Sequence, residues 1–117
     1  MAGKINKRIL RALFKDIVAW FKQKDVEWEG DFSTDTLIYF EGKQYKATGE
    51  YIQDRKPSTA AQYSDDKGLT MTFEGPLYEV INGGEMYATL EQFNALFSKH
   101  GVYYELGNAW NLTVFKG

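Results

Sequence analysis

The sequence predicts an α+β domain in which an antiparallel sheet of five to six strands carries two helices on one face. Apolar residues recur at helical spacing from residue 4 to residue 23, and after Lys24 they recur at every second position. Short polar turns join several of the later segments, and strands joined by short turns are antiparallel. Together these observations predict one class of fold, in which helices cover an antiparallel sheet.

Length and composition predict a single domain over residues 1–117, because half of this chain would form only a marginal core. Hydrophobic residues make up 44% of the chain and aromatic residues 16%, which excludes general disorder. Cysteine is absent and there is one histidine, so disulfides, thiol catalysis, thiolate zinc sites and a histidine-rich metal centre are excluded. We therefore predict no metal site and no cofactor.

The first element is an amphipathic helix over residues 4–23. Its apolar arc comprises Ile5, Ile9, Leu10, Leu13, Phe14, Ile17, Trp20 and Phe21. A row of basic residues, here called the basic stripe, lies opposite and comprises Lys4, Lys7, Arg8, Arg11, Lys15 and Lys22. Burial of the apolar arc on the sheet would turn the basic stripe outward.

Four strands are expected next, over 26–32, 37–40, 45–51 and 69–73. Ala47 and Gly49 are small residues on the inner face of the third of these strands, which predicts a close approach of a helix or a sharp bend there. Residues 54–67 have no regular period and contain Pro57, which indicates a long loop.

The last third of the chain predicts a helix and a hairpin. Pro76 and the Asn82-Gly83 pair fit a short helix over 76–82, and an edge strand fits the same residues. The sequence Thr89-Leu90-Glu91-Gln92 matches a capping box, which predicts a helix that Gly101 terminates. A terminal hairpin is expected over 102–106 and 110–114, with its turn at Gly107-Asn108.

The charge of the chain is divided between its two parts. Residues 1–24 hold seven basic residues and one acidic residue, a net charge of +6. The remaining residues hold seven basic and fifteen acidic residues, a net charge of −8. We expect a basic helical side and an acidic open face of the sheet, a polarity that bears on partners rather than on fold.

Chemical motifs are weak throughout the chain. His100 falls in the last turn of a predicted helix, where an imidazole complements the helix dipole, and no nucleophile lies near it in sequence. Pairs such as Glu50 with Glu74 are expected by chance among sixteen acidic residues. We predict no catalytic residues and expect that the protein is not an enzyme.

Two irregular segments are the predicted partner-binding site. The long loop contributes Arg55, Lys56, Tyr63, Asp65 and Asp66, and the connection that follows Gly83-Gly84 contributes Glu85, Met86 and Tyr87. Tyrosine, methionine and arginine are enriched in protein interfaces. The expected partner is therefore a protein.

The leading functional prediction is a non-enzymatic protein-binding module. Small size, absence of cysteine, many aromatic residues and polarised charge loosely resemble phage or mobile-element accessory proteins, which implies binding and inhibition of a host protein. This resemblance lies in composition and assigns no residue. Binding of a small molecule in an aromatic pocket between the sheet and the first helix is the alternative, and nucleic-acid binding through the basic stripe ranks third. We expect a cytoplasmic protein without a membrane-spanning segment, and self-association is compatible with the sequence.

Overall fold

The computed structural model describes residues 5–55 and 68–117, and this part of the chain forms three helices and six strands. In chain order they are α1 (Lys7–Glu27), β1 (Thr36–Phe40), β2 (Lys43–Lys46), β3 (Tyr51–Asp54), β4 (Leu69–Phe73), α2 (Pro76–Asn82), α3 (Tyr87–Ser98), β5 (Val102–Asn108) and β6 (Asn111–Lys116). The predicted α+β class is confirmed.

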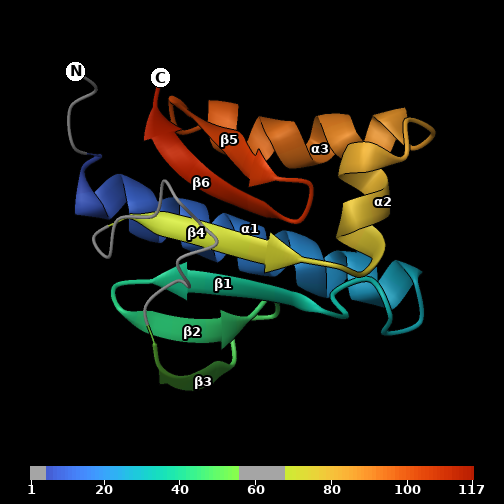
Figure 1. Cartoon of the computed structure of the whole chain (residues 1–117), viewed down its shortest axis with the longest axis horizontal. Coiled ribbons are helices and arrows are strands. Elements are labelled where there is room, and N and C mark those ends of the chain that lie inside the picture. The colour runs from blue at the N-terminus through green and yellow to red at the C-terminus, as the bar shows by residue number, and fades with distance from the viewer. Residues whose placement is uncertain (1–4, 56–67) are drawn as a thin grey trace.

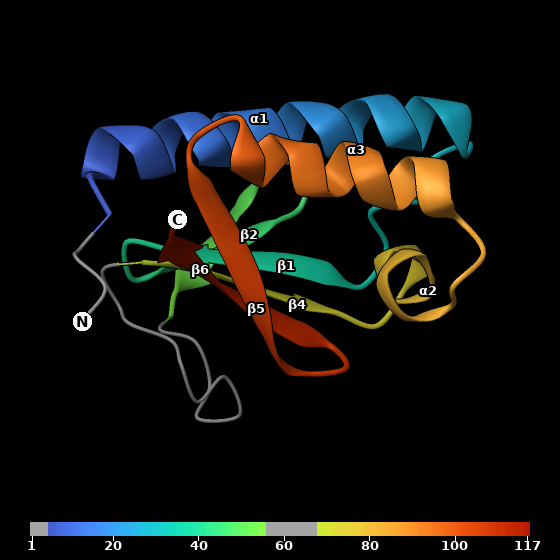
Figure 2. The ribbon, with the colours of Figure 1, turned by 90° about the horizontal axis from the view of Figure 1, so that it is seen from above.

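The six strands form one antiparallel sheet in the order β3-β2-β1-β4-β6-β5. Helices α1 and α3 lie on the same side of this sheet (Figure 2), and α2 lies beyond the end of β4 (Figure 1). The prediction that the N-terminal helix and the helix near residues 90–100 share one face is thus confirmed. The opposite face of the sheet carries no helix of the described chain.

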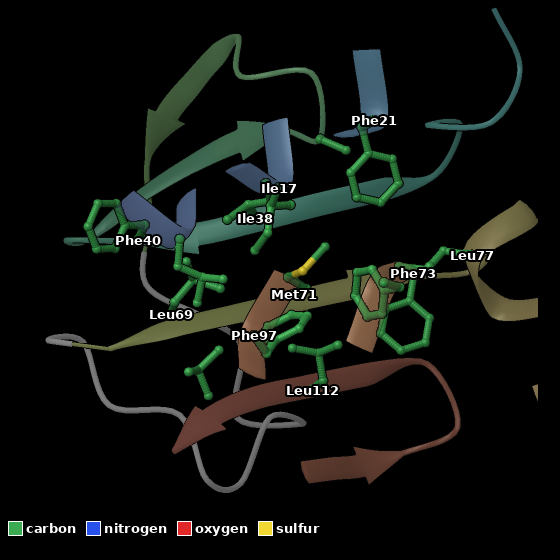
Figure 3. Close-up of a cluster of buried hydrophobic side chains, with 14 of the residues drawn as sticks. Ile17, Phe21, Ile38, Phe40, Leu69, Met71, Phe73, Leu77, Phe97 and Leu112 are labelled. Atoms are coloured by element: carbon green, nitrogen blue, oxygen red, sulfur yellow. The ribbon is translucent and has the colours of Figure 1, made fainter. Parts of the chain in front are cut away.

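The core lies between the sheet and the two long helices. Ile17 and Phe21 of α1 point toward Ile38 and Met71 of the central strands (Figure 3), and all four side chains are fully buried. The alternation along each strand decides which residues enter this core, because successive side chains point to opposite faces. Phe14 stacks on Phe40 with ring centroids 5.4 Å apart, so aromatic side chains fill the space between α1 and the sheet.

Helix α1 begins and ends later than the helix predicted over 4–23, because it runs from Lys7 to Glu27. Its N-cap is Asn6, whose side chain accepts a hydrogen bond from the backbone N–H of Arg8 at 2.7 Å. The helix continues to Glu27, so the strand predicted over 26–32 is wrong. Val26 is 82% exposed on the outer side of the last turn. The alternation of apolar and charged residues around it is also typical of a strand, which explains the wrong prediction.

The strand predicted over 45–51 is also wrong, because β2 and β3 divide this segment. The backbone N–H of Gly49 donates to the Lys46 carbonyl at 2.8 Å and closes the turn between them. Gly49 has φ +96°, and a Cβ atom at this position would lie 2.9 Å from Cγ1 of Val18 on α1. The predicted close approach of a helix at Ala47 and Gly49 is therefore confirmed.

The segment after β4 is a helix rather than an edge strand, with Pro76 in its first turn. The capping box predicted at Thr89 is wrong, because α3 begins at Tyr87 and its N-cap, Met86, makes no side-chain capping bond. Gly101 has φ +72° and follows α3, as expected.

The terminal hairpin is confirmed, but its turn lies at Ala109-Trp110. The reason is that β5 extends to Asn108 through an irregularity between Leu106 and Asn108.

Candidate functional site

Strand β5 forms one border of the sheet. It pairs with β6 on one side, and no strand of the described chain pairs with its other side. Its sequence, VYYELGN, contains neither proline nor lysine, two residues that commonly protect exposed edges from pairing. Tyr103 and Leu106 are 45% and 40% exposed. This edge is open to another strand.

The ladder with β6 determines which backbone groups of β5 are free. In an antiparallel pair, the backbone groups of successive residues point alternately toward the neighbouring strand and away from it. The N–H of Gly117 donates to the carbonyl of Gly101 at 3.0 Å, and Val102 then lies opposite Lys116. The backbone groups of Tyr103 therefore face β6. Those of Val102, Tyr104 and Leu106 face outward, where no other strand among the described residues satisfies them.

A groove runs between this edge and α3. It has a volume of about 570 Å³, and its walls are Glu91, Asn94, Ala95, Phe97 and Ser98 from α3 and Val102, Tyr103 and Tyr104 from β5. Glu91, Ala95 and Ser98 recur at helical spacing and are exposed, so they form one stripe along α3. Figures 1 and 2 show β5 at the border of the sheet, starting near the C-terminal end of α3.

The floor of the groove is held in place by core packing. The ring of Tyr104 packs against Phe93 and Phe97, with centroid distances of 5.5 Å and 4.9 Å. The Tyr104 hydroxyl donates to Oδ1 of Asn94 at 2.6 Å, which ties β5 to α3. Burial raises the pKa of this hydroxyl above its ordinary value of 10.0, a value with which it would already be a neutral donor at physiological pH. These contacts hold α3 and β5 together on either side of the groove.

A second hollow lies on the face of the sheet opposite α1 and α3. Its volume is about 510 Å³, and it is lined by residues 33–37, Lys46, Thr48, Ile52, residues 72–74 and Trp110. Leu37 pairs with Lys46 and with Thr72 across neighbouring strands, so these residues form its floor. Ile52 and Trp110 are 40% and 46% exposed and supply apolar surface. Acidic, basic and hydroxyl side chains share the remainder of the lining.

The predicted partner-binding residues do not form one surface within the described chain. Lys56, Tyr63, Asp65 and Asp66 lie outside the described residues. The backbone N–H of Arg55 donates to the carbonyl of Gly42 at 2.8 Å, so Arg55 lies beside the turn between β1 and β2. The connection between α2 and α3 lies at the other end of the sheet (Figure 1). There Glu85 and Tyr87 are exposed and Met86 packs against the core.

The basic stripe lies on the exposed side of α1, apart from Lys4, which is outside the described residues. Lys7, Arg8, Arg11, Lys15 and Lys22 are all exposed. Arg11 forms an ion pair with Glu41 at 3.2 Å. No described residue of the stripe lines either of the two hollows named above. The stripe is therefore an exposed, charged surface of α1.

The described residues contain no group of three or more histidine, cysteine or acidic side chains that could hold a metal ion. No helix of the described chain is long and apolar enough to cross a membrane.

His100 joins two helices instead of acting only at the end of α3. Its Nε2 lies 2.6 Å from Oδ2 of Asp16 on α1, and Nζ of Lys99 lies 3.3 Å from the same oxygen. The hydrogen bond to His100 is the main cause that lowers the pKa of Asp16, while partial burial of the carboxylate opposes the shift. The histidine therefore has a structural partner far away in sequence.

Acid is expected to remove the stabilisation that Asp16 provides. Its pKa in the folded chain lies below the ordinary value of 3.8, so the stabilisation is complete above that value and disappears as the pH falls through the lowered pKa. Asp16→Asn should lower the free energy of unfolding by about 1 kcal/mol at pH 7. This is the usual contribution of a hydrogen bond to a charged group, reduced because the carboxylate is partly exposed. Urea unfolding of both chains at several pH values would test this. A difference that persists unchanged well below pH 3.8 would contradict it.

Comparisons of the sequence with protein-family models and with curated proteins, and of the structure with solved structures, give no match. The candidate site therefore stands on its geometry. Sequence reasoning missed the groove, although it placed the hairpin that forms one wall. The sequence offered only a partial signal, a strand without lysine or proline over 102–108 that follows a helix with small residues at Ala95 and Ser98.

Proposed function

We propose that this chain is a non-enzymatic protein-binding module that binds an extended segment of its partner as an added strand on β5. The observation that carries the proposal is the free edge of β5 beside a helix-lined groove. Outward backbone groups at Val102, Tyr104 and Leu106 offer alternate donors and acceptors to another main chain. Strand addition is a recurring mode of peptide recognition in which the edge supplies affinity and neighbouring pockets supply specificity.

A polypeptide matches this site better than the other partners that the sequence allows. A nucleic acid has no row of amide groups to continue the ladder, and its phosphates would approach Glu91 and Glu105. Self-association through β5 meets a similar difficulty. A two-fold antiparallel pairing centred on the strand places Glu105 of one copy opposite Glu105 of the other, and like charges at opposed positions are destabilising.

A proline substitution tests the proposal, with peptides selected from a random display library on the immobilised wild-type chain as probes. Leu106→Pro removes an outward N–H without removing a bond to β6, and proline is tolerated on edge strands. We expect Leu106→Pro to weaken peptide binding at least about tenfold, because the complex loses one backbone hydrogen bond and the peptide fits the edge less well. Leu106→Ala keeps the N–H and should weaken binding less.

The two variants separate the backbone contact from the side-chain contact. Circular dichroism and thermal unfolding should first establish that Leu106→Pro keeps the fold of the wild type. Equal binding by a folded Leu106→Pro chain would refute strand addition at β5.

Small-molecule binding remains the alternative function, but not in the predicted pocket between the sheet and the first helix, because buried side chains fill that space. The hollow at Trp110, on the opposite face of the sheet, is the observation that favours it. Its volume of about 510 Å³ lies within the usual range of ligand pockets, roughly 300–1,000 Å³. A ligand that binds the native state raises the melting temperature. A compound that stabilises the wild type but not Trp110→Ala would support this function, and failure of a broad compound library to stabilise the wild type would argue against it.

The prediction that the partner is a host protein inhibited by this chain rests on composition alone. Strand addition would supply a mechanism for such inhibition, because a captured segment is no longer free for its own pairing or folding. The partner's identity decides between inhibition and simple docking.

A further inference from the structure

This inference rests on the proposed function. We infer that the partner segment is basic, with a lysine or arginine and an apolar residue two positions apart, both on the side that faces α3. Three features of the groove between α3 and β5 support this inference. They are its charge, its apolar floor and the alternation of side chains that strand pairing imposes.

The charge of the groove is negative. Glu91 is the one charged residue among those that line it, and it lies in an exposed position on α3. Glu105 adds a second exposed carboxylate on the other face of β5. The neighbouring cations are Lys99, which pairs with Asp16 on α1, and Lys116, which lies opposite Val102 on β6. Neither cation lines the groove, and Glu91 forms no ion pair with another described residue, so its carboxylate is available to a basic side chain.

The floor of the groove is apolar and has room for a side chain. Phe97 and Val102 are buried beneath it, and the ring of Tyr104 is half-buried beside them. The α3 wall carries the small residues Ala95 and Ser98 at this point. An aliphatic or aromatic side chain above them would bury apolar surface on both sides, which favours binding.

Strand pairing determines how these two contacts are spaced. Side chains of a partner strand that lie opposite Val102 and Tyr104 point to the same face of the sheet, and that face carries α3. The residue between them points to the other face, toward Tyr103 and Glu105. An extended segment with an apolar residue and a basic residue two positions apart therefore satisfies the apolar floor and Glu91 together.

The composition of the selected peptides and a charge reversal test this inference. Peptides selected from the random library should be enriched in lysine and arginine over the unselected pool. Glu91→Lys should weaken their binding about fivefold or more at low salt, and added salt should reduce this difference. Glu50→Lys gives the matched control, because it makes the same change of net charge at an exposed position in the turn before β3, the other border strand of the sheet.

A second variant tests the apolar contact. Ala95→Phe fills the groove from an exposed helical position and should weaken binding of the same peptides about tenfold or more, while leaving the unfolding transition unchanged.

The outcomes separate the inference from the proposed function. Enrichment of acidic or uncharged peptides, or equal effects of Glu91→Lys and Glu50→Lys, would overturn the inference, and loss of binding in Leu106→Pro would then leave strand addition intact. Unchanged binding in a folded Leu106→Pro chain would overturn both.

Discussion

Replacing Phe21 with alanine is expected to destabilise the protein by about 3–5 kcal/mol, the usual cost of removing a large aromatic side chain from a core. Phe21 is fully buried where α1 meets the sheet. Its ring packs against Trp20 and Phe32 with centroid distances of 5.1 Å and 5.7 Å, so the cavity would lie within an aromatic cluster that cannot easily close. Chemical unfolding followed by circular dichroism measures this loss.

Two neighbouring residues serve as controls for this prediction. Lys22 is exposed on the basic stripe, and its replacement by alanine should change stability by less than about 0.5 kcal/mol. Trp20 is only partly buried but donates from Nε1 to Oε1 of Gln92 at 3.3 Å, so Trp20→Ala should cost less than Phe21→Ala and more than Lys22→Ala. Equal, small losses for all three would mean that another face of α1 contacts the sheet.

Gly75→Ala is expected to cost about 3 kcal/mol or more, at the upper end of the range for overpacking. A Cβ atom at Gly75 would lie 2.1 Å from the backbone carbonyl oxygen of Thr34, so the chain before β1 or the start of α2 would have to move. A backbone atom cannot rotate away as a flexible side chain can. The same chemical unfolding experiment gives the magnitude.

Gly84 provides the comparison for Gly75. It has φ +74°, and nothing lies within 4 Å of an added Cβ atom, so Gly84→Ala should cost only the strain of a left-handed backbone, about 1–2 kcal/mol. A smaller loss at Gly75 than at Gly84 would show that the connection before β1 adapts without cost.

The class of fold could be predicted because its main signals are long. Helix α1 keeps its periodicity over 21 residues, and β4 alternates over Leu69–Phe73 without interruption. The errors fall where the signal is short. Two alternations around Val26 predicted a strand where the helix continues, and a two-strand segment around Gly49 appeared continuous because a four-residue turn preserved the alternation.

The candidate site could be predicted only in part. The hairpin that carries β5 was visible in sequence, but the order of strands in the sheet was not, and that order alone makes β5 a border. The groove requires α3 to lie beside β5, which depends on tertiary packing such as the contact of Phe97 with Tyr104. The length and charge of the loop over 54–67 led to its prediction as a partner-binding segment, and most of this loop lies outside the described residues.

Residue-resolved amide hydrogen exchange, measured by NMR on the chain alone and with a selected peptide, is the most direct test of strand addition at β5. In the free chain the amides of Tyr103 and Glu105 should be protected by β6, whereas those of Val102, Tyr104 and Leu106 should exchange quickly. Bound peptide should protect these three amides. Rapid exchange at all three in a chain saturated with peptide would contradict strand addition.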